Sequence, residues 1–341
     1  MNEPRRTERA DEVPVETPPW PRYGDVAIVA ARPSRKSHDP FRPQAFFLEQ
    51  EFSAAGTVDD VATLFLTNKE CPFRCLMCDL WQNTLVDSVP AGAIPAQIDF
   101  ALSELFPADR PPTAKHIKLY NSGNFFDHRA IPRIDYAPIA ERVRHFETVI
   151  VENHPRLCGA DCFQFQSLLR QNGGIARLEV AIGLETVHPQ VLDRLNKRMT
   201  LEDVERALTF LQDLGIATRA FLLLRPPFLS EEEGIDWCLK SVQFAFDRGV
   251  GCCSIIPVRA GNGIMEKLQT DGWFSPPSLE AFESTFDEAL KIAAGRGRVF
   301  VDTWDLPASA SLVSANFEQR HARLRQMNLT QKILPRVADH D

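Results

Sequence analysis

The sequence lacks any apolar run of the ~18 residues that a membrane-spanning helix needs. Its first residues, MNEPRRTERADEVPVE, also lack the apolar stretch of a signal peptide, because charges stand in its place. We therefore expect a cytoplasmic protein with no membrane partner. An excess of positive charge is missing too. The 46 acidic residues against 38 Lys and Arg give a formal net charge of -8, which disfavours strong sequence-independent binding to nucleic acid.

No internal repeat and no second catalytic domain is visible in the 341 residues. Apolar residues make up 44% and charged residues 25%, which is the composition of a globular protein. Residues 1–45 are rich in proline and charge without periodicity and predict an irregular N-terminal arm. We expect a core domain over residues 46–300 and a C-terminal extension over residues 301–341, with a polar helix around 320–328.

Within the core, short β-like runs alternate with longer amphipathic stretches. Strands are predicted over residues 61–68, 116–121, 148–153, 178–183, 218–224, 252–258 and 297–302, and helices over 95–106, 136–146, 163–171, 201–215 and 232–249. Strands that alternate with helices are typical of a parallel sheet. Six such units predict an α/β fold, a partial (β/α)6 barrel rather than a closed eight-stranded one, with an open doubly wound sheet as the alternative.

Eight cysteines stand at 71, 75, 78, 158, 162, 238, 252 and 253. In a reducing cytosol such a set indicates ligating, catalytic or buried thiols rather than disulfides. Cys71, Cys75 and Cys78 form a C-x3-C-x2-C pattern directly after the first predicted strand. Three thiolates from one short loop suit an iron–sulfur cubane and leave one iron open. The alternatives are three unrelated buried thiols, or a zinc site that a distant Cys or His completes.

The Cys71-x3-Cys75-x2-Cys78 pattern resembles the defining motif of the radical S-adenosylmethionine superfamily. The resemblance implies a [4Fe-4S] cluster whose open iron binds S-adenosylmethionine. It also implies reductive cleavage to a 5'-deoxyadenosyl radical, and an external electron donor of the ferredoxin or flavodoxin type. Met77 stands where that family places a residue against the adenine.

Polar residues follow the next two predicted strands. Asn121, Ser122 and Gly123 lie in KLYNSGNFFD, at a strand end where barrel active sites lie, although an ordinary turn is the alternative. In the resembled family this loop often reads Gly-Gly-Glu and contacts the amino group of the methionine. Glu152 ends an apolar run and is expected to face a ligand or cation, since isolated carboxylates are costly to bury. It resembles the acidic residue that binds the ribose hydroxyls. For His154 we favour a structural role over acid–base chemistry.

The stretch LEVAIGLETVHPQVLDRLNKRMTLEDVERALTFLQDLGI resembles the fourth-strand region of oxygen-independent coproporphyrinogen oxidases, methylthiotransferases and elongator-like enzymes. That resemblance implies that Glu185 and Lys197 contact S-adenosylmethionine, whereas solvated side chains are the alternative. Phrases such as KLYNSGNFFD, LNKRMT and DGWFSPPSL are closest to the branch of the elongator catalytic subunit and the archaeosine-synthesis radical enzyme.

Two arginines and two further cysteine groups complete the candidates. Arg225 and Arg259 follow the fifth and sixth strands, where they are expected to bind an anionic group of the substrate or, equally, to form salt bridges between loops. Cys158-x3-Cys162 and the Cys252-Cys253 pair are candidates for an auxiliary cluster. Adjacent residues of a strand face opposite sides, so buried or catalytic free thiols are favoured.

These observations lead to the hypothesis of a radical S-adenosylmethionine enzyme. Its substrate is undecided between a modified nucleoside in tRNA and an anionic small molecule. The competing class is a non-enzymatic protein that binds an iron–sulfur cluster or zinc.

Overall fold

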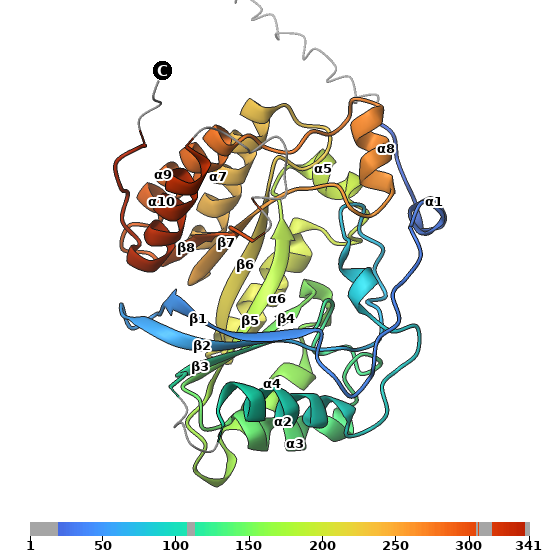
Figure 1. Cartoon of the computed structure of the whole chain (residues 1–341), viewed down its shortest axis with the longest axis vertical. Helices are drawn as coiled ribbons and strands as arrows, with labels where there is room; N and C mark the ends of the chain where they lie inside the picture. The colour runs from blue at the N-terminus through green and yellow to red at the C-terminus, as the bar shows by residue number, and fades with distance from the viewer. Residues whose placement is uncertain (1–19, 108–112, 305, 307–315, 338–341) are drawn as a thin grey trace, which may run out of the picture.

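The computed structural model describes residues 20–107, 113–304, 306 and 316–337. Their strands form one eight-stranded sheet in the order β1-β2-β3-β4-β5-β6-β7-β8 (Figure 1). β1 is antiparallel to β2, and every later neighbour is parallel. The strands span Ala45–Phe52 (β1), Val58–Phe65 (β2), His116–Tyr120 (β3), Thr148–Asn153 (β4), Arg177–Glu185 (β5), Ala217–Leu224 (β6), Cys252–Pro257 (β7) and Arg298–Val301 (β8).

The strand order confirms the predicted partial barrel, because it follows the chain without the reversal of a doubly wound sheet. Connecting helices cover the outside of the curled sheet (Figure 1). They are α2 (Ala93–Leu105), α3 (Tyr136–Val143), α4 (Ala160–Leu169), α5 (Pro189–Arg194), α6 (Leu201–Asp213), α7 (Glu231–Asp247), α8 (Ile264–Thr270) and α9 (Leu279–Ala293). The predicted start of α6 is also confirmed, since Thr200 and Asp203 form a capping box.

Side chains alternate between the inside of the barrel and the helix-covered core. On β6, for example, the side chains of Arg219, Phe221 and Leu223 line an internal cavity. The residues between them, Ala220 and Leu222, are fully buried in the main hydrophobic cluster. This period of two follows from the pleat of a strand, and it gives each strand one apolar face for the helices and one face for the lumen.

All seven predicted strands are present, but β1, the helix Asp25–Ala30 and helices α5, α8 and α9 were not predicted. β1 was missed because the first strand was expected at residue 61, after the turn that joins β1 to β2. The signal was a hairpin: β1 and β2 pair in continuous antiparallel register around a short turn. Gly56 in that turn has φ +80°, a conformation that glycine adopts without strain. For α9 the signal was Ser278, whose hydroxyl accepts from the Ala281 backbone N–H as an N-cap.

The predicted C-terminal helix is present as α10 (Phe317–Thr330), which packs against both β1 and β8. Beyond the helix, Gln331 accepts from the Val299 backbone N–H at 2.8 Å and donates to its carbonyl at 2.9 Å. Asn328 makes the same pair with Val301 at 3.0 and 2.9 Å. These amides satisfy the free edge of β8 in place of a further strand, so the barrel stays open between β8 and β1.

The described part of the predicted arm is irregular apart from the six-residue helix α1 (Asp25–Ala30). The arm packs on the loop before α8. The contact is so close that a Cβ at Gly263 would overlap the Ala31 carbonyl oxygen. None of the helices in the described part of the chain has the length and apolarity to cross a membrane.

Candidate active site

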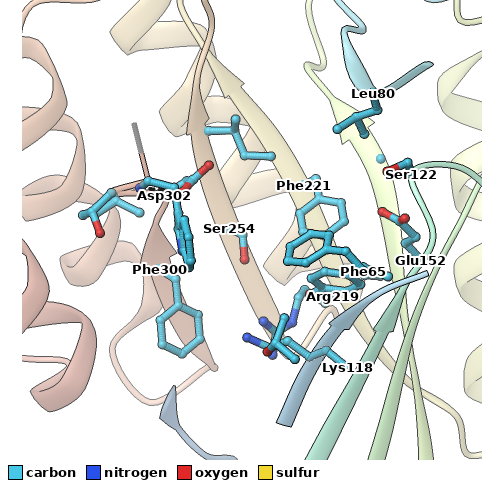
Figure 2. A pocket seen from close by; sticks show the side chains of 18 of the residues that line it. Phe65, Leu80, Lys118, Ser122, Glu152, Arg219, Phe221, Ser254, Phe300 and Asp302 are labelled. Atoms are coloured by element: carbon cyan, nitrogen blue, oxygen red, sulfur yellow. Dashed lines mark hydrogen bonds between the residues drawn. The ribbon is translucent and has the colours of Figure 1, made fainter. Parts of the chain in front are cut away.

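A cavity of about 1420 Å³ occupies the inside of the curled sheet. It exceeds the roughly 300–1,000 Å³ of most small-molecule sites, so its volume suits a cofactor and a substrate together. One end is lined by the loop after β2, which carries the three motif cysteines, and by the polar ends of β3, β4 and β5. The other end lies between β1, β8 and α10. Figure 2 shows side chains from several strands converging on this space.

Cys71, Cys75 and Cys78 all line this cavity, as free thiols. Burial raises the pKa of each, and the Cys71 thiol helps to raise the pKa of both Cys75 and Cys78, so the three lie close together. In the part of the chain that the structure describes, no group of three or more His, Cys, Asp or Glu side chains is arranged to hold a metal ion. A four-iron cluster differs from a single ion because separate irons bind its thiolates, and the donor set here suits that group.

The cysteine loop is held by polar contacts from distant parts of the chain. The buried Asn262 side chain donates to the carbonyl oxygens of Leu76 and Cys78 at 2.8 and 3.1 Å. Asn196, whose backbone is left-handed (φ +53°), donates to the Arg74 carbonyl at 2.7 Å. Sequence reasoning missed both asparagines, since nothing in their local pattern distinguishes them from ordinary turn residues.

The N-terminal arm also contacts this loop. Glu70, directly before Cys71, forms ion pairs with Arg32, Arg35 and Arg74. The Arg32 guanidinium also lies 4.6 Å from the centre of the Trp81 ring. Burial opposes the charged form of Glu70, but these arginines hold its pKa below the ordinary value. The arm predicted as irregular therefore covers and fixes one side of the cysteine loop.

The predicted loop at residues 121–123 is built around Glu152. One carboxylate oxygen accepts from the backbone N–H of Asn121 at 2.6 Å and of Gly123 at 3.2 Å. Figure 2 shows Glu152 directed toward Ser122, and both line the cavity with Gly123. Burial raises the pKa of Glu152 even though these N–H groups oppose the shift. Glu152 thus fixes the loop at the cavity wall.

Asn121 differs from its two neighbours because its side chain is not among those that line the cavity. It is fully buried, and both its amide nitrogen and its amide oxygen lack a hydrogen-bond partner in the described part of the chain. Buried polar atoms without partners are unfavourable, so a bound molecule or water beside the loop would stabilise them.

Glu185 and Lys197 form a buried ion pair on the cavity wall. The strand pairing of β5 shifts register between residues 183 and 185, and the backbone at Glu185 is left-handed (φ +67°). Both features lie where Glu185 enters the ion pair. Burial opposes the charge on Lys197, but Glu185 and the Cys75 thiol hold its pKa above the ordinary value. Lys197, the cation predicted from the sequence, therefore lies beside the cysteines and is charged. Met77 also lines the cavity.

Gly183 makes room for this ion pair. A Cβ at this position would overlap both Lys197 Nζ and Glu185 Oε1. We expect Gly183→Ala to displace the pair and to lower the free energy of unfolding by about 1–3 kcal/mol, as overpacking does. Urea denaturation measures the change. The matched control is Gly24→Ala, because nothing lies within 4 Å of a Cβ at Gly24 and its backbone is extended rather than left-handed. An unchanged midpoint for Gly183→Ala would contradict the expectation.

His154 is held by both ring nitrogens. Nδ1 accepts from the Arg156 backbone N–H at 3.2 Å, so Nε2 carries the proton and donates to the Lys197 carbonyl at 3.0 Å. The ring also stacks on Phe73 with centroids 3.8 Å apart. Burial, with the Lys197 charge, lowers the pKa of His154 to about 3. These contacts give His154 the structural role that was favoured from the sequence.

We expect the imidazole of His154 to stay neutral in the folded protein from about pH 8 to about pH 5. Because its folded pKa lies below the ordinary value of 6.5, its contribution to stability is complete above that value and declines as the pH falls toward 3. NMR of the imidazole protons tests this. A titration of His154 near pH 6.5 in the folded state would contradict it.

Arg225 and Arg259 do not converge as the substrate-mouth hypothesis expected. Arg259 lines the cavity, with its Nε 3.7 Å from Asp79 Oδ2. Arg225 is not among the lining residues, and it binds Glu231 Oε2 at 3.1 Å and the Pro276 carbonyl at 2.8 Å. The backbone at Arg225 is left-handed (φ +55°), and Gly234 of α7 leaves space for it. Its side chain joins two loops instead.

The remaining cysteines do not form one site in the described structure. Cys158 and Cys162 interact with each other, since a hydrogen bond from Cys162 lowers the pKa of Cys158. Cys252 lies beside Arg219, whereas Cys253 packs in the outer core with Cys238. The expectation that Cys252 and Cys253 face opposite sides of their strand is thus met. All are free thiols.

The deep wall of the cavity carries a network of buried charges that sequence reasoning missed. Arg219 of β6 donates to Glu51 of β1 at 2.5 and 3.1 Å and to Glu179 of β5 at 2.8 Å. Lys118 of β3 binds Glu49 at 2.8 Å and Glu51 at 2.6 Å. Burial alone would raise the pKa of Glu51, but Arg219 and Lys118 hold it well below the usual range. Figure 2 shows Lys118 and Arg219 side by side.

The half of the cavity away from the cysteines is rich in aromatic rings. Its aromatic lining residues are Phe47, Phe65, Tyr120, Phe221, Phe300 and Trp304. Phe47 and Trp304 bring β1 and the segment after β8 together, with ring centroids 4.8 Å apart. His321 of α10 lines the same half, and its Nε2 is buried without a partner among the described residues. This half therefore offers flat apolar surfaces beside the buried charges of Glu51, Lys118 and Arg219.

Sequence comparison places the chain near the predicted branch. It is 25% identical over 215 residues to archaeosine synthase subunit beta of Methanosarcina acetivorans, an alignment that covers 60% of this chain and 58% of that protein. The chain resembles the archaeosine-synthesis branch. It is also 23% identical over 267 residues to an uncharacterized protein of Methanocaldococcus jannaschii, covering 75% of this chain and 72% of the relative. No protein-family model matches the chain.

Among solved structures, Elp3 of Methanocaldococcus infernus aligns with a TM-score of 0.46 and 17% identity, over 69% of this chain and 58% of that one. The chain therefore spans less than two thirds of the length of both the Elp3 structure and the Methanosarcina subunit. The resemblance predicted from the cysteine motif and from LNKRMT is confirmed by the sequence similarity to the archaeosine synthase subunit.

Proposed function

We propose that this chain is a radical S-adenosylmethionine enzyme, with a [4Fe-4S] cluster on Cys71, Cys75 and Cys78. The observation that carries the proposal is the position of these cysteines. They line one end of a cavity large enough for two ligands, inside a partial barrel. When bound, the cluster and S-adenosylmethionine supply reductive cleavage to a 5'-deoxyadenosyl radical. The barrel wall shields that chemistry from water.

The residues beside the cysteines are suited to bind S-adenosylmethionine. Lys197 offers a buried cation for a carboxylate, and Glu185 keeps it charged and in place. Backbone and side-chain groups of Ser122 and Gly123 face the same space, held there by Glu152. Met77 provides an apolar contact for a flat ring. In this proposal the backbone N–H of Asn121 binds Glu152, and its unpaired buried amide is available to a molecule beside the loop.

The proposed substrate is a nucleoside, bound in the aromatic half of the cavity. Archaeosine is a nucleoside, and the similarity to an archaeosine synthase subunit favours this class over an anionic small molecule. Aromatic side chains such as Phe221 and Phe300 offer flat faces on which a base can stack, as in other proteins that bind unpaired bases. The electron donor is proposed to be a ferredoxin or flavodoxin type protein.

Anaerobic reconstitution tests the proposed activity. We expect about four irons and four sulfides per chain and, with dithionite and S-adenosylmethionine, formation of 5'-deoxyadenosine. A chain that binds no cluster, or that binds one but yields no 5'-deoxyadenosine, contradicts the proposal. Binding of zinc by the chain without uptake of iron would instead support the alternative of a zinc-binding protein.

Mass spectrometry of tRNA nucleosides tests the substrate. Cells with and without the gene are expected to differ in one modified nucleoside if the base is carried by tRNA. Unchanged tRNA nucleosides, with 5'-deoxyadenosine formed in vitro, would exclude tRNA and favour the alternative of an anionic small molecule.

A further inference from the structure

Asn124 lies directly after the 121–123 loop, with 2% of its surface exposed. Its Nδ2 donates a hydrogen bond to Cys71 Sγ at 3.1 Å, and its Oδ1 accepts from the His154 backbone N–H at 2.7 Å. A backbone N–H has to be met by the oxygen of the amide, so this second bond fixes the orientation of the group. The amide nitrogen is therefore the atom that faces the sulfur.

This contact distinguishes Cys71 from the other two cysteines. In the described part of the chain, Asn124 is the one side chain that donates a hydrogen bond to a motif sulfur. Burial raises the pKa of the Cys71 thiol, while the Phe73 backbone N–H, Asn124 and Lys197 oppose the shift. An N–H group aimed at a sulfur favours the more negative state of that sulfur, whether thiolate or reduced cluster.

We propose that Asn124 is a positioning residue that raises the reduction potential of the iron–sulfur cluster through its N–H···S hydrogen bond to Cys71. The inference rests on the proposed function, because it requires a cluster on Cys71. Hydrogen bonds to the sulfurs are among the factors that set the potential of such clusters, since the reduced cluster carries one more negative charge. The bond therefore makes reduction of the cluster more favourable.

Two substitutions at this position separate electrostatics from shape. Asn124→Leu removes the N–H donor and the acceptor at similar volume. Asn124→Asp keeps an oxygen for the His154 N–H but places a carboxylate against the sulfur. At alkaline pH, where the new carboxyl is ionised, we expect the midpoint potential to be highest for the wild-type chain, lower for Asn124→Leu and lowest for Asn124→Asp. A role limited to holding the loop predicts the reverse order for the two variants.

Asn153 provides the matched control. It is buried, its Oδ1 accepts from the Phe126 backbone N–H at 3.2 Å, and its Nδ2 approaches Cys158 Sγ at 3.5 Å. It therefore holds the same loop with an amide but contacts a different sulfur. We expect Asn153→Leu to leave the midpoint potential unchanged. A shift as large as that of Asn124→Leu would assign the effect to loop distortion and overturn the inference.

The measurement is a mediated redox titration of the reconstituted full-length chain, followed by electron paramagnetic resonance and normalised to iron per chain. A wild-type chain without a cluster contradicts the proposed function itself. Equal potentials in wild-type, Asn124→Leu and Asn124→Asp proteins that each hold a full cluster overturn the role of Asn124 alone. The ordered decrease supports it.

Discussion

Cys75→Ala is expected to abolish both cluster binding and cleavage of S-adenosylmethionine. Cys75 is the central cysteine of the motif, and its thiol also helps to raise the pKa of Lys197. Two remaining thiolates leave two irons of a cubane without protein ligands, so the cluster should not persist. We expect iron near the level of the unreconstituted protein and no detectable 5'-deoxyadenosine, as measured by iron analysis and chromatography.

Cys158→Ala is the control, because Cys158 is also half-buried and free but does not line the cavity. It is expected to retain the four irons per chain and the cleavage activity. If Cys158→Ala instead removes part of the iron while activity remains, an auxiliary cluster is present after all. If Cys75→Ala keeps a full cluster, the assignment of the motif fails.

Arg219→Met is expected to lower the free energy of unfolding by about 3–5 kcal/mol, the usual cost of removing one partner from a buried ion pair. Arg219 is 2% exposed and pairs with both Glu51 and Glu179. Its loss leaves two buried carboxylates with fewer cations, and both carboxyl pKa values should rise. Urea denaturation near neutral pH measures the change.

Arg248→Met is the matched control, because Arg248 pairs with Glu205 at the surface, where ion pairs contribute little. Its unfolding midpoint is expected to match that of the wild type. The loss in Arg219→Met should shrink as the pH falls, because the carboxyls whose pKa values rise in the variant become neutral in its folded state and no longer need a cation. Equal midpoints for the Arg219 and Arg248 variants would show that the deep network does not stabilise the barrel.

The main strands were predictable because their signals are local. A short apolar run such as residues 149–151 is typical of a strand buried on both faces, and it can be read without knowledge of the partner strand. The cysteine motif was predictable for the same reason, since three thiols within one short loop stay near one another in any fold. β1 and α9 had local signals as well, a glycine turn after Phe52 and a serine N-cap at Ser278, which the sequence interpretation did not use.

Side-chain direction at loops was not predictable in the same way. Arg225 and Arg259 both follow barrel strands, yet a left-handed backbone turns Arg225 onto α7 while Arg259 remains at the cavity. One residue's φ decides between these outcomes, and no periodic pattern encodes it. Glu152 likewise ends its strand as expected, but its partners are backbone N–H groups of a loop about thirty residues earlier in the chain.

By itself the sequence determined the parallel βα order, the position of Cys71, Cys75 and Cys78 after the first barrel strand, and the resemblance to the archaeosine-synthesis branch. Tertiary structure alone decided that Asn124 contacts Cys71, that Asn262 holds the cysteine loop, and that α10 keeps the barrel open. The physical reason is the separation along the chain over which each interaction acts. Pleat, helix period and motif spacing act between near neighbours in the chain, whereas a hydrogen bond between residues 76 and 262 exists once the whole barrel has formed.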